Sequence, residues 1–385
     1  MPTALVVFAA ACAILALAGV AYRALCTFAG LRFLAAAAAR PKSSFAPPVS
    51  IMKSLKGVDP HMYAAFRSHC LLDYPEYEVL FGVSDLQDPA VALVEHVQRE
   101  FPNAALRVVH CPQVLGSNGK ISCLAQVLPH AKYEHVLVND SDILVEPDFL
   151  RRVMWHFEDE PVGVVTTLYR AVAGSSIWSK VEAVGIDTDF MSGVLVAREL
   201  EGGVRFALGA TIATTKSVLA KIGGLESLVD VLGDDYELGA RPAAAGYRVE
   251  LADAVVETAV ADYSWREFWQ HQLRWARTNR DLRPSGYFGM IVTYGVAWAV
   301  LAAVAAPRAW WTWAVLAITL IARFAAALVL GRCLFRGAQV ARNFWLIPLR
   351  DFVALGVWLA SYFGNTVVWR GEKFRLQRGK LYPVS

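Results

Sequence analysis

The sequence has few charged residues and no pattern among its cysteines. Asp, Glu, Lys and Arg make up only 18% of the 385 residues. The six cysteines occur without CxxC pairs or metal-ligand spacing, which excludes a cysteine-built metal centre and predicts reduced side chains that serve in packing. A net charge of +3 is too small to indicate a nucleic-acid partner. Nothing in the sequence indicates an obligate protein partner.

Apolar residues are abundant instead. They make up 56% of the chain, and the mean hydropathy is +0.39. A value this high indicates that part of the chain lies in lipid. Because 385 residues also exceed what one compact core usually holds, we expect membrane segments beside a soluble domain.

The first apolar run covers 3–22, carries no charge and is long enough to cross a bilayer. We therefore predict an N-terminal anchor over 1–24 and a linker over 25–47. Basic residues follow the run and none precedes it, so the positive-inside rule places the following domain in the cytoplasm. A cleaved signal peptide is the alternative, although the basic segment that it needs is missing.

Two further apolar runs lie close together near the end of the chain. They cover 287–306 and 310–330 and are separated by only three residues. This arrangement predicts a transmembrane hairpin within 286–331.

The last apolar run, 343–364, is interrupted by charge. Arg350 and Asp351 lie inside it, and an acid and a base within a full span are unfavourable. The tail over 369–385 is basic and is expected on the cytoplasmic side. We therefore predict that the segment 332–368 holds a basic loop and a re-entrant or third C-terminal membrane segment, which dips into the bilayer or lies along its surface.

The middle of the chain, 48–263, alternates short β-rich apolar runs with helical patterns. This alternation is typical of an α/β, Rossmann-like domain with a mostly parallel sheet. The expected strands cover 49–55, 77–84, 106–110, 134–139 and 162–169.

Polar side chains follow several of these strands. In open α/β sheets the ligand lies outside the carboxyl ends of the strands, where Asp85, Asp140 and Asp142 are expected. The first strand contains Lys53, and Lys120 opens a helix. Two carboxylates one residue apart offer hard oxygen ligands to Mg²⁺ or Mn²⁺, and lysines can meet phosphate charge. The alternative is that both aspartates are ordinary turn and cap residues.

Two later clusters are also polar. Asp234 and Asp235 precede a helical segment, where they either cap the helix or supply a general base. The segment 264–285 begins with a capping box of Ser264 and Glu267 and is rich in Trp and Arg. Such a composition predicts an interfacial helix, because Trp favours the headgroup level and Arg reaches phosphate.

The order of these clusters resembles that of a known enzyme family. Asp85, Asp140, "GDDYELG" and "HQLRW" follow one another as in the inverting family 2-like glycosyltransferases of the GT-A fold, which share a D, D, D, (Q/R)xxRW pattern. With "SLKG", "NGK", "NDSD" and "WRGEKFRL" added, the chain is most similar to the ceramide glucosyltransferase family, family 21, and its bacterial relatives that glycosylate hopanoids. That resemblance implies a GT-A domain with transmembrane helices and a bacterial inner-membrane location.

The resemblance also implies roles for the strand-end residues. Asp85 would contact the nucleotide of a UDP-sugar, and Asp140 with Asp142 would hold a divalent cation, Mg²⁺ or Mn²⁺, and the diphosphate. Lys53 and Lys120 would complete the nucleotide-sugar site.

The later motifs would supply the chemistry. Asp235 would be the catalytic base that deprotonates the acceptor hydroxyl, and Arg274 with Trp275 would close the site around the donor. The family has Gln or Arg where this chain has His271, whose charge varies near neutral pH. The acceptor side would be formed by Asp234, His271 and Gln272.

Three functions remain open at this point. The first is transfer of a hexose, most simply glucose, from a UDP-sugar to ceramide in the bilayer. The second is transfer of glucose or N-acetylglucosamine to a hopanoid polyol such as bacteriohopanetetrol, and the third is a membrane protein that binds nucleotide-sugar without turnover. A processive polysaccharide synthase is disfavoured, because so few membrane segments make little wall for a channel. The segment 170–208 is predicted either to pack or to line the acceptor route.

Overall fold

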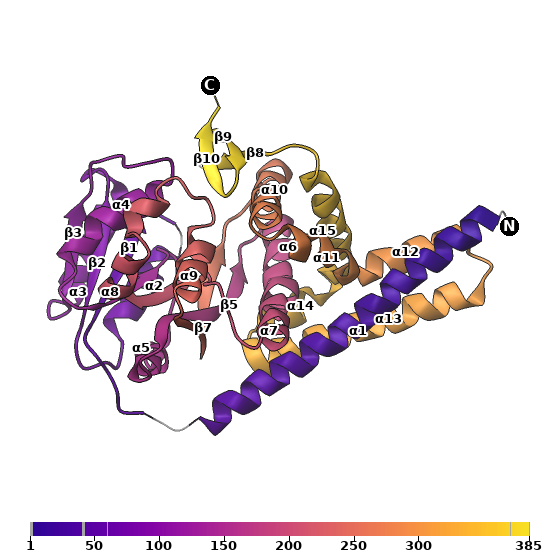
Figure 1. Ribbon diagram of the computed structural model, residues 1–385, viewed down its shortest axis with the longest axis horizontal. Coiled ribbons are helices and arrows are strands. Elements are labelled where there is room, and N and C mark those ends of the chain that lie inside the picture. The colour runs from indigo at the N-terminus through magenta and orange to yellow at the C-terminus, as the bar shows by residue number, and fades with distance from the viewer. Residues whose placement is uncertain (1–2, 41–42, 60, 370, 385) are drawn as a thin grey trace.

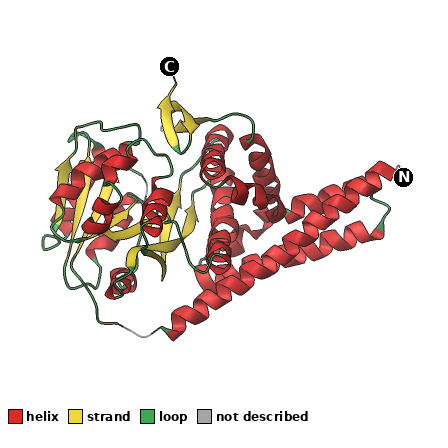
Figure 2. Cartoon of the chain, viewed as in Figure 1, coloured by secondary structure: helices red, strands yellow, loops and turns green. Residues whose placement is uncertain are grey.

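The computed structural model describes residues 3–40, 43–59, 61–369 and 371–384. One side of the molecule is a sheet flanked by helices, and the other is a bundle of long helices that contains the N-terminus (Figures 1 and 2). Helices α6, α10 and α15 lie between these two parts (Figure 1).

The sheet has seven strands in the order β3-β2-β1-β4-β6-β5-β7. Strands β3, β2, β1 and β4 are mutually parallel, β6 is antiparallel to both of its neighbours, and β5 is parallel to β7. The strands are β1 Val49–Leu55, β2 Tyr77–Val83, β3 Leu106–His110, β4 His135–Asn139, β5 Val162–Ala173, β6 Thr211–Thr215 and β7 Arg248–Val260.

All five expected strands are confirmed, to within a residue except at the end of β5. The central strand β1 is buried almost throughout, as expected of a strand covered on both faces. Strands β6 and β7 were not predicted, and β6 is the antiparallel strand that makes the sheet mixed.

Helices cover the sheet and connect its strands (Figure 1). Asp88 caps α3 and Pro89 is its first residue, as the N-terminal preferences predict. These helices are α2 Met62–Cys70, α3 Pro89–Glu100, α4 Gly119–Val127, α5 Phe149–Met154, α8 Lys216–Lys221 and α9 Asp234–Ala244.

The segment for which the sequence left two possibilities, 170–208, is mainly a long interrupted helix. Helix α6, Ile177–Gly185, passes through a π-helical turn, Ile186–Phe190, into α7, Met191–Leu200. The turn packs between β5 and the membrane helices.

Helix α10, Trp265–Leu282, carries the "HQLRW" motif, and its predicted capping box is present. Ser264 accepts from the Glu267 amide, and Glu267 accepts from the Ser264 amide. The box fixes the residue at which the helix begins.

Helix α1, Thr3–Ala39, has 37 residues, so the predicted linker was wrong over 25–39. That segment is rich in Ala and Leu, which favour helix. At 1.5 Å per residue the helix is about 55 Å long, well beyond the roughly 30 Å of a bilayer core. The helix is therefore longer than one crossing needs, and it also packs on α7.

Two helical arms are present where the hairpin was predicted, and the first arm is broken; that they cross the membrane stays a prediction. Helix α11, Pro284–Gly289, and a 3₁₀ turn to Thr293 meet α12, Gly295–Ala305, at a bend of 54°. Arg23 donates to the carbonyl of Thr293 at 3.0 Å, and so satisfies backbone that the break leaves free. The second arm, α13, covers Trp310–Leu330 and continues as a π-helical turn, Gly331–Phe335.

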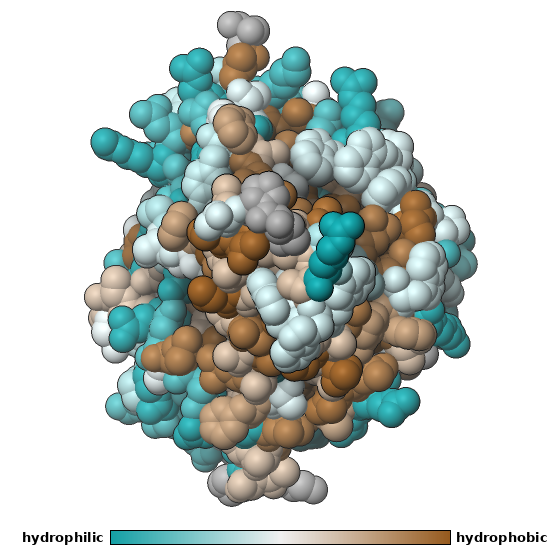
Figure 3. Space-filling view, turned by 90° about the vertical axis from the view of Figure 1, so that its right-hand side faces the viewer, coloured by the Kyte–Doolittle hydropathy of each residue, from teal (hydrophilic) through white to brown (hydrophobic). Residues whose placement is uncertain are grey.

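The outer surface of this bundle is apolar, and hydrophobic side chains gather on the face seen in Figure 3. Val7, Ile14, Trp310 and Ile321 are among the exposed ones. In the part of the chain that the structure describes, three helices are long and apolar enough to cross a membrane, or four if the bent pair forms one span.

The last apolar run, 343–364, forms a short 3₁₀ turn and α15 Ile347–Ser361, and α14 Ala338–Asn343 precedes it. Arg350 and Asp351 do not pair with each other, because each contacts residues on other helices. Exposed Trp345, Leu349 and Phe352 are spaced along one face of the segment, a pattern that suits an interfacial helix. Since its length and composition also suffice for a crossing, the re-entrant or interfacial location stays a prediction.

The basic tail is folded. It forms a second, antiparallel sheet of β8 Thr366–Trp369, β9 Glu372–Gln377 and β10 Lys380–Pro383. The Leu381 amide donates to the Asp230 carbonyl at 2.8 Å, and the Leu232 amide donates to the Gly379 carbonyl at 2.9 Å. The tail therefore holds the segment immediately before "GDD".

Candidate active site

The polar side chains meet where β1 and β4 end and where α4 and α9 begin. Lys120 Nζ, from the first turn of α4, lies 2.6 Å from Asp140 Oδ1 and 3.9 Å from Asp234 Oδ2. Asn118 caps α4 by accepting from the Ile121 amide, and it donates to Asp234 Oδ1 at 3.1 Å. Two sequence-distant segments, "GSNGK" and "GDD", are thereby joined at one point.

The environment of Asp142 differs from that of Asp140. Asp142 Oδ2 accepts from Thr258 Oγ1 at 2.7 Å and from the Ala259 amide at 3.0 Å, both on β7. Burial and the nearby Asp140 raise the pKa of Asp142. Asp140 is more exposed, at 40%, and faces Lys120.

Asp140 and Asp142 were predicted to hold a divalent cation together with the substrate. Among the described residues, no group of three His, Cys, Asp or Glu side chains could hold a metal alone. Mg²⁺ commonly binds one or two carboxylates together with substrate phosphates and water, so a pair such as Asp140 and Asp142 suffices. That this pair is the metal site stays a prediction.

Asp235 has the properties of a general base. It is the second residue of α9, and its Oδ1 accepts from the Tyr236 amide at 2.8 Å. Burial, with the charge of Asp234, raises the pKa of Asp235 to about 6. A Cβ atom at Gly209 would lie 3.2 Å from Asp235 Oδ2, so the glycine keeps space open beside that oxygen.

Arg274 faces this acidic group from α10. Burial lowers the pKa of Arg274, and the charges of Glu182, Asp235 and Asp234 oppose that effect. Its guanidinium makes no hydrogen bond with any residue in the described ranges. A partly buried, unengaged arginine beside carboxylates is suited to an anionic ligand such as a diphosphate.

Tyr169, in the second half of β5, was not predicted as a site residue. Burial and the nearby Asp235, Asp140 and Glu182 hold its pKa well above the usual range. Its hydroxyl is therefore a neutral hydrogen-bond donor that lies among the site carboxylates. Its only distinguishing feature in the sequence is its place as the last residue of the expected strand 162–169.

His271 and Gln272 are held by a carboxylate that the sequence analysis also missed. Glu182, from α6 and only 3% exposed, contacts His271 Nδ1 at 3.1 Å and accepts from Gln272 Nε2 at 3.1 Å. Because a carboxylate only accepts, Nδ1 carries the proton. The His271 ring lies 4.6 Å from the Trp275 ring on the same helix, so His271 links Glu182 to the tryptophan of the motif.

Lys53 does not lie where the sequence suggested. It is fully buried, and its Nζ donates to the carbonyl of Asp140 at 2.9 Å. Burial lowers its pKa to about 7. Its ammonium group is therefore enclosed by protein and bonded to the backbone of the Asp140 loop. Lys53 supports that loop from within the fold, whereas the sequence placed it against the phosphates of the donor.

Asp85 lies at the same sheet edge but apart from the main cluster. Its Oδ1 accepts from the Gln87 amide in the exposed loop after β2. The strand order puts β1 between this loop and Asp140. Contact between Asp85 and a nucleotide stays a prediction.

A family model for glycosyl transferase family 21 matches residues 11–382. The chain belongs to this family. Membership confirms the prediction of a glycosyltransferase enzyme, and the mixed sheet with added membrane helices confirms the predicted fold class.

Several characterised proteins are similar to this glycosyltransferase. Ceramide glucosyltransferase 1 of Caenorhabditis elegans is 22% identical over 86% of this chain and 72% of its own length. Ceramide glucosyltransferase 3 of the same organism is 23% identical over 63% of this chain, and the match spans about half, 53%, of that relative. Beta-monoglucosyldiacylglycerol synthase of Synechocystis is 25% identical over 66% of this chain and 52% of its own length.

Among solved structures, the mannosyltransferase PcManGT from Pyrobaculum calidifontis, in complex with GDP-Man and Mn²⁺, matches with a TM-score of 0.51. It is 21% identical, and the match covers 91% of this chain and 99% of that one. This likeness supports the glycosyltransferase fold.

Proposed function

We propose that the chain is a membrane-bound inverting hexosyltransferase that moves glucose from UDP-glucose to the hydroxyl of ceramide, giving glucosylceramide. The observation that carries this proposal is the environment of Asp235. Its pKa is raised, Gly209 leaves space beside its Oδ2, and the charged side chains of Lys120, Asp140 and Arg274 lie near it. Family 21 membership and the ceramide glucosyltransferase relatives support the choice of reaction.

The reaction needs a base on one side of the sugar and positive charge on the other. Asp235 Oδ2 accepts the proton of the lipid hydroxyl, whose oxygen bonds to the anomeric carbon as the bond to the diphosphate breaks. Attack opposite the leaving group inverts that carbon in one step. With a pKa of about 6, Asp235 starts mostly deprotonated at neutral pH, and it releases the accepted proton to solvent afterwards.

The departing diphosphate is stabilised by this chain's own cations. Lys120 and Arg274 approach from different helices, and Tyr169 can donate a hydrogen bond without carrying charge. A divalent cation held by Asp140 and Asp142 would, when bound, neutralise part of the diphosphate charge. Lys53 keeps the Asp140 loop in place from below.

The acceptor side follows from the membrane helices. Helix α10 is followed directly by the bent pair, which is α11 with its 3₁₀ turn and then α12. We therefore expect the lipid hydroxyl to approach Asp235 from the bilayer surface beside α10. Basic residues after the first span support a cytoplasmic catalytic domain at a bacterial inner membrane.

A second acceptor fits the same chemistry. A hopanoid polyol such as bacteriohopanetetrol also presents a hydroxyl at the bilayer surface, and glucose or N-acetylglucosamine could be the transferred sugar. The diacylglycerol-type relative shows that proteins similar to this chain differ in their lipid substrate. A receptor that binds nucleotide-sugar without turnover is disfavoured, because it would have no need of a base with a raised pKa.

Product analysis tests the proposal. The full-length protein in detergent is supplied with UDP-glucose, UDP-N-acetylglucosamine or GDP-mannose, each with ceramide, diacylglycerol or bacteriohopanetetrol. We expect glucosylceramide by mass spectrometry, with a β-linkage by NMR as inversion requires. If glycosylated hopanoid is the only product, ceramide is not the acceptor and the hopanoid polyol takes its place. If the protein binds UDP but forms no product, the proposal is overturned in favour of a receptor.

A further inference from the structure

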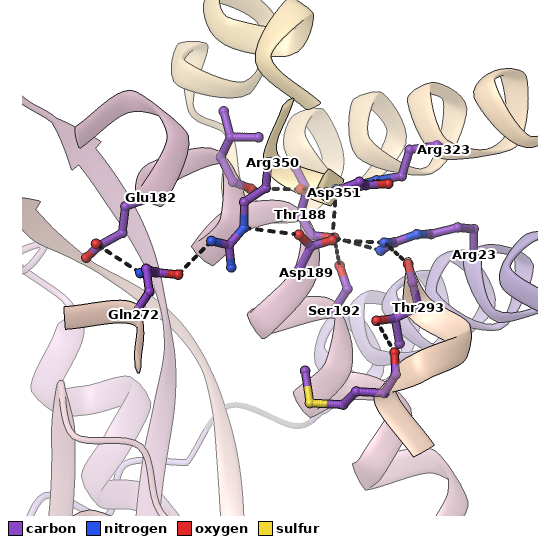
Figure 4. A network of polar contacts seen from close by, with 12 residues as sticks. Arg23, Glu182, Thr188, Asp189, Ser192, Gln272, Thr293, Arg323, Arg350 and Asp351 are labelled. Carbon is purple, nitrogen blue, oxygen red and sulfur yellow. Dashed lines mark hydrogen bonds and ion pairs between the residues drawn. The ribbon is translucent and has the colours of Figure 1, made fainter. Parts of the chain in front are cut away.

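Three arginines from three membrane-associated helices converge on one carboxylate. Arg23 of α1 lies 2.9 Å from Asp189 Oδ1, Arg323 of α13 lies 2.8 Å from the same atom, and Arg350 of α15 lies 3.6 Å from Oδ2 (Figure 4). Asp189 belongs to the π-helical turn that interrupts α6 and α7. That turn is therefore the meeting point of the bundle and the catalytic domain.

Further contacts hold the same arginines in place. Arg323 also pairs with Asp351 at 3.0 Å, and it donates to Thr188 Oγ1 at 3.1 Å. Arg23 donates to the carbonyls of Thr188 and Thr293. Buried charges demand such partners, so the helices are seated on the turn in one defined arrangement.

One route leads from Asp189 to the motif through Arg350. Arg350 Nη1 donates to Gln272 Oε1 at 2.6 Å, and Gln272 Nε2 donates to Glu182 Oε2 at 3.1 Å (Figure 4). Gln272 is 5% exposed. Arg350 thus bridges the turn and the motif helix, a double contact that suits the planar guanidinium.

A second route runs through the next residue of the turn. The ring of Phe190 stacks on Trp275 at 6.3 Å with an interplanar angle of 28°, and it lies 6.1 Å from the ring of Tyr169. Gln272 and Trp275 are separated by about one helical turn. Both routes therefore end on the same stretch of α10, next to Arg274.

We propose that Asp189 is a positioning residue, which sets the place of "HQLRW" relative to the donor site according to how α1, α13 and α15 are seated. The proposal rests on the proposed function for its kinetic consequence. It predicts that breaking the Asp189–Arg350–Gln272 chain slows transfer far more than it weakens binding of UDP, because the other predicted UDP contacts, Asp85, Lys120 and Asp140, do not belong to α10.

Two substitutions break the chain in different ways. Asp189→Asn keeps the shape and removes the charge that gathers the arginines. Arg350→Lys keeps the charge, but a lysine cannot contact Gln272 and Asp189 together. A matched control is Arg32→Gln, which removes an ion pair between α1 and α7, Arg32–Glu199, on the exposed surface.

Transfer kinetics and hydrogen exchange are measured on the full-length protein in detergent. We expect kcat to fall by about 10- to 100-fold in both variants, as for a displaced catalytic group, with the KM for UDP-glucose within about twofold of wild type. Amide exchange over 268–276 should accelerate at least about tenfold. Arg32→Gln should change neither quantity.

The double variant distinguishes coupling from general damage. If Asp189 acts through Arg350, the two losses in kcat should not add, and the double variant should match the slower single one. Unchanged exchange in α10, or fully additive losses, would overturn the proposal. If Asp189→Asn fails to fold, Arg350→Lys alone decides by the same criteria. If wild type transfers no sugar, the proposed function fails, and the exchange data still decide the role of Asp189.

Discussion

Lys120 and Asp140 form an ion pair of 2.6 Å that joins the first turn of α4 to the loop after β4. The lysine also faces Asp234, 3.9 Å away, and so lies between the predicted metal and diphosphate pair and the acidic pair that contains the base. Its positive charge lowers the pKa of Asp235. One side chain thereby couples the donor half of the site to the acceptor half.

Removal of this lysine should be severe. Lys120→Met should reduce transfer by about 10²- to 10³-fold, as expected for loss of one group that stabilises the leaving charge, and should weaken UDP binding. Isothermal titration with UDP and a transfer assay measure both. Lys132→Met is the matched control, because Lys132 pairs with Glu76 at the exposed surface. Equal activity in the two variants would contradict the assignment.

The pH profile should report Asp235. Because its pKa is raised to about 6 and the base must be deprotonated, kcat/KM should fall about tenfold per pH unit below pH 6 and level off above it. Lys120 lowers this pKa, so residual activity of Lys120→Met should show its acid limb at higher pH. Asp234 raises the pKa, and Asp234→Asn should move the limb to lower pH. A limb that stays at the same pH in both variants would exclude Asp235 as its origin.

Chelation tests the metal prediction. Treatment with EDTA should reduce transfer by about 100-fold or more, and Mn²⁺ or Mg²⁺ should restore it, because the metal neutralises leaving charge. Asp140→Asn should raise the Mn²⁺ concentration needed for half-maximal activity, which electron paramagnetic resonance can also follow as bound Mn²⁺. Full activity after dialysis against EDTA would contradict a metal at Asp140 and Asp142.

Lys53 should make stability depend on pH. Its pKa is about 7 in the folded protein and 10.5 when unperturbed, so between these values the unfolded chain binds a proton that the folded chain does not. Stability should therefore rise with pH across this window, by up to about 1.4 kcal/mol per unit, and stay flat with respect to this group below pH 7. Unfolding in detergent at several pH values measures the slope. Lys53→Met should be less pH-dependent than wild type, and parallel slopes would refute the prediction.

Local patterns predicted much of the fold. The strands β1 to β5 follow from short apolar runs, and the start of α10 follows from Ser264 and Glu267, three residues apart. Asp140, Asp234 and Asp235 could be selected because they follow a strand or begin a helix. The family resemblance supplied their order.

Features that depend on tertiary contacts could not be predicted. Glu182 holds His271 across 89 residues of sequence, and nothing near it in the chain indicates that role. From the sequence, Lys53 was expected to face the ligand. Its burial depends on the helices that cover both faces of β1, which a local pattern does not reveal. The length of α1 was missed because the basic residues after its apolar run suggested an end, whereas Arg23 continues the helix and pairs with Asp189.

The central claim is that Asp235 is the base of a transfer reaction. The decisive measurement is the rate of glucosylceramide formation by Asp235→Asn alongside its affinity for UDP, with Glu237→Gln on the same helix as the control. Glu237 pairs with Arg241 away from the cluster. We predict a loss of about 10³-fold or more in transfer with unchanged UDP affinity, and no loss in the control. Transfer by Asp235→Asn at the wild-type rate would contradict the account.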